Sequence, residues 1–255
     1  MTEHIDISKE SGVLHLVIDR PAKKNALTDG MYRALSDALE ASEGDPTTRS
    51  VLIRSTGPTS TAGNDLGEFA AAATGGEVLQ HVGRFLRALV ALSKPLVAAV
   101  QGQAVGIGTT LLLHCDQVLV AEDAQLVAPF VSLALVPEAA STLLLPARIG
   151  HVRAFSMFAL GEPVSARDAV AWGLANRVVP SDRLATEADA LARRLARQPL
   201  GALVATKRLM RDTHAVTRQM EVEAREFLAR LTTAEAQEAF LAFAQKRTPD
   251  FTKFG

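Results

Sequence analysis

The amino-acid sequence predicts an α/β fold, and three observations carry this prediction. Short runs of β-branched and aliphatic residues alternate with helical patterns through the first half of the chain. Two glycine-rich corners directly follow such runs, and the remainder of the chain is dominated by helical patterns. Strands that alternate with helices are typical of crossover units in a largely parallel sheet. A chain of 255 residues is long enough for one large core with a smaller appendage.

Buried strands are expected where short apolar runs are bounded by turn residues. The run VLHLVI, for example, ends at the turn residues Asp19, Arg20 and Pro21. By this criterion, strands are predicted at residues 13–18, 50–55, 95–100 and 117–121.

Helices are expected where apolar residues recur at helical spacing. In the first half they are predicted at 28–41, with Thr28 as N-cap, and at 78–92. After about residue 140 the strand signal ends, and helices are predicted at 151–160, 165–172, 182–197, 201–211, 217–231 and 232–246. Ser165 with Asp168 and Thr232 with Glu235 have the spacing of capping boxes. The chain therefore divides into an α/β core, residues 1–195, and a helical region, residues 196–255.

Composition narrows the classes of function. The net charge of −1 provides no electrostatic basis for binding nucleic acid or an acidic membrane. Cys115 is the single cysteine, so no internal disulfide can form. The histidines lack the spacing of metal ligands. The polar start, the absence of a run of about 18 apolar residues and an ending unlike a peroxisomal signal predict a cytoplasmic protein.

Two strand–turn–helix corners are the strongest candidates for a site. They lie at 60–66, STAGNDL, and at 102–108, GQAVGIG. Small residues let the backbone approach a ligand closely, and a helix N-terminus offers free amide donors. Two facing corners would supply converging N–H groups for an oxyanion. The alternative for each corner alone is a simple tight turn, and neither matches a dinucleotide or P-loop motif.

Five segments in the same order and spacing resemble the enoyl-CoA hydratase/isomerase (crotonase-like) family over nearly the whole chain. They are RPAKKNAL at 20–27, AGNDL at 62–66, GQAVGIG at 102–108 followed by Leu111 and Cys115–Asp116, Pro137–Glu138, and KRTPDF at 246–251. The resemblance implies a crotonase-like spiral of ββα units with a C-terminal helical region that makes trimer contacts. It further implies an acyl-CoA or enoyl-CoA substrate, a homotrimer or a dimer of trimers, and no separate cofactor, because CoA is part of the substrate. No metal is implied.

The resemblance also assigns roles to residues. The amides of Asn64 and Ile107 would form the oxyanion hole. Contacts to CoA and substrate would come from Lys24, Ala26, Ala62, Gly63, Asn64, Asp65, Leu66, Gly106, Thr110 and Phe130. Lys23 and Lys24 fit contacts to CoA phosphates or, equally, solvated surface positions. Asp65 also fits an N-cap.

The two glutamates that activate water in hydratases of this family would fall at Thr110 and Phe130. Neither position is acidic, which argues against efficient hydration, although Thr110 could orient a water. Glu138 remains, in a segment (LVPEAAS) similar to that of Δ3,Δ2-enoyl-CoA isomerases, where this glutamate is the base. The alternative for Glu138 is a first-turn helix acid.

A pocket and acyl tunnel for this base are expected from neighbouring apolar residues: Phe130, Val131, Leu133, Leu135, Val136 and Leu143. Burial in such a pocket would raise the pKa of the glutamate toward the working range. Tyr32 and Trp172 are expected to be packing residues, and His114 and Cys115 structural ones.

The resulting prediction is an isomerase that moves the double bond of a 3-enoyl-CoA to the 2-position, with Glu138 as its one base. Two alternatives stay open. One is another crotonase-type reaction, either hydration or thioester hydrolysis. The other is a non-catalytic acyl-CoA-binding member of the family.

Overall fold

The computed structural model describes residues 4–65, 67–68 and 80–254. Its main sheet has the strand order β1-β2-β3-β4-β6-β9, with β1 and β2 antiparallel and the other neighbours parallel. These strands are β1 (Ile5–Glu10), β2 (Val13–Ile18), β3 (Ser50–Ser55), β4 (Leu96–Val100), β6 (Gln117–Ala121) and β9 (Arg177–Val179). A second sheet, β5-β7-β8, is formed by β5 (Gln103–Val105), β7 (Gln125–Val127) and β8 (Val164–Ser165).

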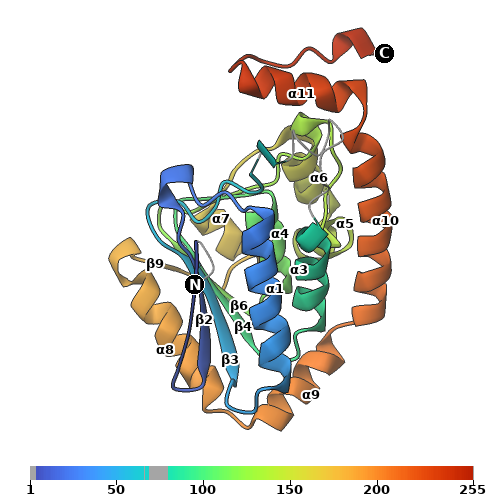
Figure 1. The fold of residues 1–255 in the computed structure, drawn as a ribbon. Coiled ribbons are helices and arrows are strands. Elements are labelled where there is room, and N and C mark those ends of the chain that lie inside the picture. The colour runs from blue at the N-terminus through green and yellow to red at the C-terminus, as the bar shows by residue number, and fades with distance from the viewer. Residues whose placement is uncertain (1–3, 66, 69–79, 255) are drawn as a thin grey trace.

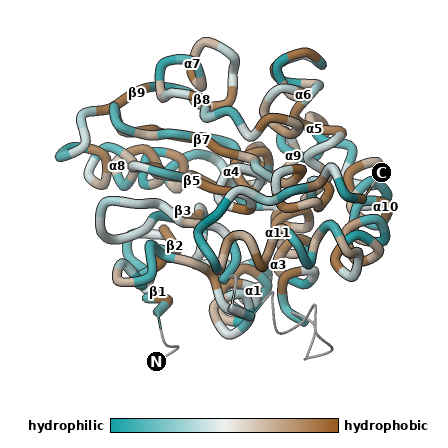
Figure 2. Tube along the Cα trace, turned by 90° about the horizontal axis from the view of Figure 1, so that it is seen from above, coloured by the Kyte–Doolittle hydropathy of each residue, from teal (hydrophilic) through white to brown (hydrophobic). Residues whose placement is uncertain are grey.

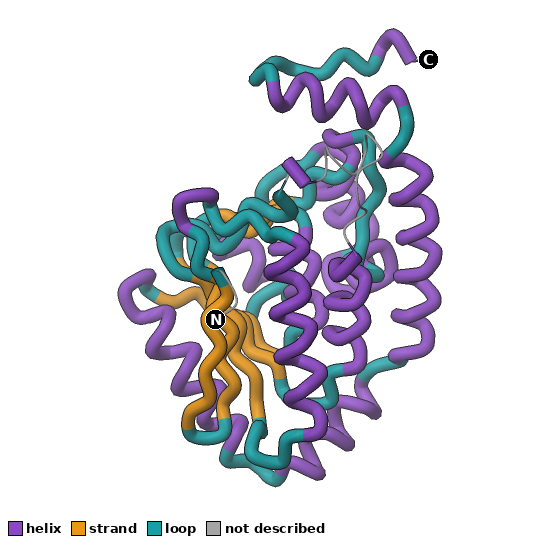
Figure 3. Tube along the Cα trace, in the orientation of Figure 1, coloured by secondary structure: helices purple, strands orange, loops and turns teal. Residues whose placement is uncertain are grey.

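Helices cover both faces of the main sheet and continue past it (Figures 1 and 3). The α-helices are α1 (Asp29–Gly44), α3 (Gln80–Ala91), α4 (Ile107–Thr110), α5 (Ser141–Ile149), α6 (His151–Leu160), α7 (Ala166–Ala171), α8 (Leu184–Ala196), α9 (Leu200–Met210), α10 (Thr213–Leu231) and α11 (Ala234–Ala244). Short 3-10 turns lie at η1 (Pro21–Lys23), η2 (Leu111–His114), η3 (Val131–Leu133), η4 (Ser181–Arg183) and η5 (Thr252–Phe254).

The inner strands of the main sheet, β2, β3, β4 and β6, are largely apolar on both sides because both sides are covered. In β2, Val13 packs into the cluster with α8, whereas Leu14 and Leu16 join the cluster with α1 and α3. Parallel strands covered on both faces read as continuous apolar runs rather than alternating ones. This explains why β2, β3 and β6 have the bounds expected from the sequence, and the expected α/β class and spiral architecture are confirmed.

The strands β5 and β7 of the second sheet follow the carboxyl ends of β4 and β6, whereas α9 lies at the amino ends of these two strands, where Lys207 contacts Lys94 and Asp116. Helix α10 runs along α3 and α5, and α11 turns away at its end (Figure 1). Hydrophobic stretches concentrate between these layers, while apolar segments also reach the outside on α6 and α9 (Figure 2). Within the described residues, none of the helices combines the length and apolar character that a membrane crossing requires.

The expectation that strands end after about residue 140 was wrong. Strands β8 and β9 lie beyond that point, and β9 forms the far edge of the main sheet beside β6. They have two and three residues, which is too short for a periodic pattern, and β9 contains Arg177. The edge strand β1 was also missed, because only Ile5 among its residues is buried.

Several helix boundaries also differ from the expectation. Helix α5 was not predicted: it contains Pro146, and it begins after Ala140, which provides no side-chain cap. The N-cap of α11 is Thr233, whose hydroxyl accepts from the Ala236 amide, while Thr232 ends α10. The capping role of Ser165 is confirmed by its bond from the Asp168 amide. Residues 78 and 79 of the expected helix 78–92 lie outside the described residues.

Candidate active site

The loop after β2 is held by two polar side chains of the segment RPAKKNAL. The fully buried Asn25 donates to the carbonyls of Thr56 and Thr59, at 2.8 and 2.7 Å. Its own side-chain oxygen accepts from the Arg20 amide at 2.8 Å. Arg20 in turn forms an ion pair with Asp65, at 2.7 Å. These bonds explain the residue types in this segment: they fasten the loop containing Lys24 and Ala26 to the first corner.

The two glycine corners are joined through their main chains. Thr61 pairs with Ala104, since the Thr61 amide donates to Gln103 and its carbonyl accepts from the Val105 amide. A Cβ on Gly63, whose φ is +90°, would lie 3.0 Å from the Val105 carbonyl oxygen. A Cβ on Gly108 would lie 2.4 Å from a Thr61 side-chain carbon. The small residues are therefore required where one corner touches the other.

The arrangement leaves the two predicted oxyanion donors free. The Leu27 amide donates to the Gly63 carbonyl, and the Asp65 amide donates to the Leu27 carbonyl. The Asn64 amide lies between these two hydrogen bonds and points away from Leu27. Ile107 is the first residue of α4, where amides have no partner inside the helix. Within the described part of the chain, neither amide donates a hydrogen bond. Two free amides on joined corners are the kind of donors that an oxyanion hole requires.

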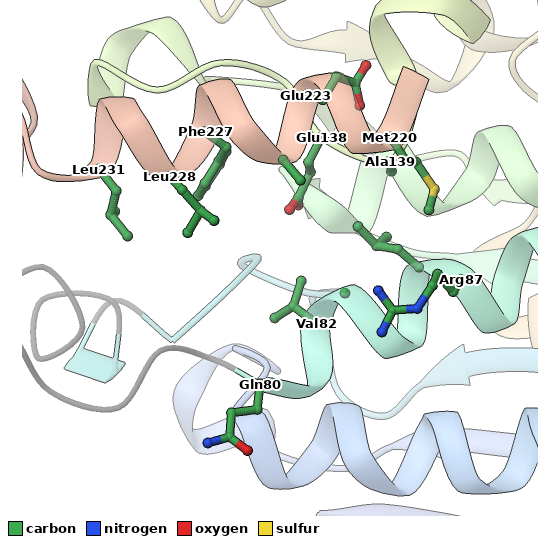
Figure 4. A pocket seen from close by; sticks show the side chains of 13 residues that line it. Gln80, Val82, Arg87, Glu138, Ala139, Met220, Glu223, Phe227, Leu228 and Leu231 are labelled. Atoms are coloured by element: carbon green, nitrogen blue, oxygen red, sulfur yellow. The ribbon is translucent and has the colours of Figure 1, made fainter. Parts of the chain in front are cut away.

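Glu138 lies in a cavity of about 320 Å³ between α3 and α10. Its carboxyl points into the cavity, toward Val82 (Figure 4). The walls are mainly apolar and include Leu86, Met220 and Phe227. Glu138 is only 7% exposed, and its Oε1 is buried without a hydrogen-bond partner among the described residues. A buried carboxyl oxygen without a partner is costly for stability and is common at reactive sites.

The surroundings of Glu138 favour its protonated form. Burial, with a smaller contribution from the nearby Glu223, raises its pKa from 4.5 to about 7. A carboxyl with this pKa is present in both forms near neutral pH, so it can accept a proton and return it.

The backbone after Glu138 is held in an unusual conformation. Ala139 and Ala140 have φ values of 64° and 54°, the left-handed region. For residues other than glycine this costs about 1–2 kcal/mol each. The Ala139 carbonyl accepts from His114 Nε2 at 2.8 Å, and His114 Nδ1 accepts from Arg211. Burial lowers the pKa of His114 to about 3, so the ring is neutral and supports this turn as a structural residue.

Tyr32 connects the first corner with helix α3. Its hydroxyl donates to the side-chain oxygen of Asn64, and its ring lies 5.5 Å from that of Phe85. Burial raises the pKa of Tyr32 well above its usual value, and the charge of Glu138 raises it further. The hydroxyl therefore remains a donor. Tyr32 packs as expected from the sequence but also orients Asn64, a role that the sequence alone did not indicate.

Thr110 and Phe130 occupy the positions of the missing acids. Thr110 is buried on α4, and its hydroxyl has no hydrogen-bond partner among the described residues. Phe130 packs edge-on against Phe158, with ring centroids 6.3 Å apart. Neither residue lines the cavity that contains Glu138.

The expected acyl tunnel differs from the observed cavity. None of the six apolar residues between 130 and 143 that were expected to form it is part of the cavity wall. Val131 and Leu143 are 46% and 40% exposed. The wall comes from α3 and α10 instead, because α10 returns from the C-terminal region to pack against both α3 and α5.

Two of the residues predicted to contact CoA, Lys24 and Ala62, are joined through their main chains. The Lys24 side chain is exposed, and its backbone adopts the left-handed conformation. The Lys24 carbonyl accepts from the Ala62 amide at 2.9 Å. The Asp65 side chain accepts from the Gly67 amide at 3.0 Å, in addition to its ion pair, so it organises the corner. Leu66 lies outside the described residues. In the described part of the chain, no group of His, Cys, Asp and Glu side chains has the arrangement of a metal site.

Sequence reasoning missed Glu223 altogether. It lies on α10, 4% exposed, and lines the same cavity as Glu138. Its Oε1 accepts from the amide and the hydroxyl of Thr142, at 2.9 and 2.5 Å. Only its burial distinguishes it from the exposed acids of α10, and burial arises from the packing of α10 on α5.

Comparisons with known proteins identify the family of the chain. Residues 8–253 match the family model described as enoyl-CoA hydratase/isomerase, so the chain belongs to this family. It is 35% identical over 260 residues to a 1,2-epoxyphenylacetyl-CoA isomerase of Escherichia coli, with 99% of each chain covered. It is also 34% identical over 247 residues to a 2,3-dehydroadipyl-CoA hydratase of the same organism, covering 96% of this chain and 97% of the relative.

Solved structures support the same assignment. An enoyl-CoA hydratase/isomerase from Pseudoalteromonas atlantica superposes with a TM-score of 0.93 at 40% identity, covering 98% of this chain and 100% of the other. The relatives include both isomerases and hydratases, so membership identifies an enzyme family with more than one reaction.

Proposed function

We propose that the protein is a Δ3,Δ2-enoyl-CoA isomerase, with Glu138 as its acid–base group. One observation carries the proposal: among the described residues, the carboxyl that points into the apolar cavity is that of Glu138, and its Oε1 has no hydrogen-bond partner there. Isomerisation needs one group that removes a proton and returns it elsewhere. Hydration needs acids placed to activate a water, and positions 110 and 130 provide none.

In the proposed reaction the Glu138 carboxylate removes a proton from C2 of the 3-enoyl thioester. The electrons move onto the thioester oxygen, giving a dienolate. The amides of Asn64 and Ile107 hold this oxygen, and each donor in such a site contributes about 2.7–4 kcal/mol to lowering the barrier. Protonated Glu138 then delivers the proton to C4, and the double bond moves into conjugation with the carbonyl.

The substrate in this proposal is an acyl-CoA thioester. The printed names of relatives, among them an enoyl-CoA delta isomerase from rat, support this class. The CoA portion would bind to the loop with Lys24 and Ala26 and to the corner at residues 62–65. Main-chain groups suit this task, because the CoA portion of the substrate does not change during the reaction.

The test is an assay with 3-enoyl-CoA, following the absorbance of the conjugated 2-enoyl thioester and the mass of the product. Wild-type protein should give conjugation at unchanged mass. Glu138→Gln keeps the size of the side chain but removes the base, and should lower kcat by about 10²–10⁴-fold. Binding of a saturated acyl-CoA should remain near that of wild type.

The matched control is Glu226→Gln, because Glu226 is exposed on α10 and is not part of the cavity wall. It should retain wild-type turnover. Full activity of Glu138→Gln would refute the assignment of the base. Binding without turnover on any enoyl chain would instead indicate a non-catalytic acyl-CoA-binding protein.

A second candidate is a crotonase-type reaction with water, either hydration or thioester hydrolysis. The observation that favours it is the buried Thr110 hydroxyl, which has no partner among the described residues and is available to a water. Product mass separates the candidates: both reactions with water add its mass, whereas isomerisation leaves the mass unchanged. Thr110→Val should abolish a reaction that depends on this hydroxyl.

The trimeric assembly is part of the same proposal. Phe155 on α6, Leu209 on α9 and Phe243 on α11 are 63%, 84% and 60% exposed in the single chain. Large apolar side chains at this exposure favour burial against other copies. Light scattering should give the mass of three chains or six, and a monomer at micromolar concentration would refute the assembly.

A further inference from the structure

Two buried carboxyls line the cavity, but they face different surroundings. The carboxyl of Glu138 points into the cavity, and that of Glu223 points to the opposite side (Figure 4). Each has one oxygen without a partner among the described residues. Nothing in the proposed reaction uses Glu223, so its burial and its contacts need a separate explanation.

The contacts of Glu223 are with the turn that contains Glu138. Its Oε1 accepts from the amide and hydroxyl of Thr142, in the first turn of α5. Gln219, one turn earlier on α10, donates to the Thr142 hydroxyl at 2.8 Å. Because Ala140 has no side-chain cap to offer, Glu223 acts as the cap of α5 from a helix far away in sequence.

The turn is therefore held from two sides. His114 donates to the Ala139 carbonyl on one side, and Glu223 accepts from the amide and hydroxyl of Thr142 on the other. The two left-handed alanines lie between these contacts. A conformation of this kind persists only where the surroundings fix it, so the direction of the Glu138 side chain depends on both.

We propose that Glu223 is a positioning residue for Glu138, fixing the turn that carries the base and placing a second negative charge behind it. This inference rests on the proposed function, in which Glu138 is the base.

The surroundings of the two acids decide which one is charged. Burial raises the pKa of Glu223, but the amide and hydroxyl of Thr142 oppose this shift because they favour its carboxylate. Glu138 has no such donor among the described residues. When two close acids differ in this way, the one with donors ionises first and the other keeps its proton to higher pH. Consistent with this, the charge of Glu223 adds to burial in raising the pKa of Glu138.

Other ionisable groups surround Glu138 without replacing this effect. They are Tyr32 on α1, Glu68 after the first corner, Arg87 on α3 and His114 in η2. Tyr32 and His114 are uncharged near neutral pH, because burial raises the pKa of the former and lowers that of the latter. Among the described residues, burial contributes most to the raised pKa of Glu138 and the charge of Glu223 adds to it.

The experiment is Glu223→Gln in the full-length protein, which keeps the shape and an acceptor oxygen but removes the charge. The Glu138 carboxyl is titrated by carbon NMR with labelled glutamate, its signal being assigned by its loss in Glu138→Gln. The pH dependence of kcat/KM on 3-enoyl-CoA is measured in parallel. We expect both the titration and the acid limb of kcat/KM to move to lower pH, and kcat to fall.

The exposed Glu226→Gln on the same helix should move neither. A purely structural Glu223 would lower stability or kcat but leave the titration of Glu138 at its wild-type pH, and that result would overturn the proposal. If Glu223→Gln does not fold, Thr142→Val removes one donor that favours the Glu223 carboxylate. It should move the titration the same way by a smaller amount, and an unchanged titration would again overturn the proposal.

The titration requires no turnover. If wild-type protein fails to isomerise 3-enoyl-CoA, the proposed function fails, while a Glu138 titration that responds to Glu223 still supports the positioning role. If turnover is present and the titration does not respond, the function stands and the positioning role fails.

Discussion

Glu138 should make the folded protein less stable as the pH rises. Its pKa is about 7 in the folded protein, against an ordinary value of 4.5 that applies to the unfolded chain. Between these two pH values the unfolded chain loses the proton while the folded protein keeps it. The stability associated with Glu138 is therefore fully present below pH 4.5 and is lost as the pH rises to about 7. At about 1.36 kcal/mol per pH unit, the loss is about 3 kcal/mol.

Glu138→Gln removes this titration and should flatten the corresponding part of the pH dependence. The assay is urea unfolding of wild type and variant at a series of pH values from about 4.5 to 8. The difference in unfolding free energy should change by about 3 kcal/mol across the series, in favour of the variant at high pH. Glu226→Gln provides the control, and its difference from wild type should stay constant. A constant difference for Glu138→Gln as well would refute the assigned pKa.

Three further predictions concern the reaction and the turn. On 3-enoyl-CoA, kcat/KM should rise with pH through about 7 as Glu138 becomes the carboxylate, and a pH-independent rate from 5 to 9 would contradict its role as base. Gly63→Ala places a Cβ 3.0 Å from the Val105 carbonyl oxygen at a φ of +90° and should lower kcat by about 10²–10³-fold, whereas Gly44→Ala, with open space around it, should leave kcat unchanged. His114→Leu leaves a buried carbonyl and a guanidinium without their partner and should lower the unfolding free energy by about 1–3 kcal/mol, measured by urea unfolding.

The strands that the sequence predicted with correct bounds are strands that are buried on both sides of the sheet. The runs at 13–18, 50–55 and 117–121 are continuous because one set of side chains meets α8 and the other meets α1 and α3. β9 has no such signal: it is three residues long and begins with Arg177, and only its register against β6 makes it a strand. Information of that kind lies in the partner strand and not in the segment itself.

The candidate site also contains residues that the local sequence predicts and one residue that it does not. Glu138 and the two corners lie in continuous segments, so motif and turn chemistry were enough to select them. Glu223 is one of three acids within a single helix, with Glu221 and Glu226, and the other two are exposed. Its neighbours Thr142 and Ala140 are about 80 residues away in the chain. No local pattern distinguishes a helix acid that caps a distant helix from one that faces solvent.

The presence of two buried acids raises the question of whether they could form the pair that a hydratase needs. Their contacts argue against it. The Glu223 carboxylate is held by donors from the α5 turn and points away from the cavity, so it is not placed to act on a water at the substrate. Its charge instead raises the pKa of Glu138, which is the property needed by a group that must both take and return a proton near neutral pH. In the proposed function, these two acids with unequal surroundings therefore provide one reactive carboxyl, which is sufficient for moving a double bond but not for adding water across it.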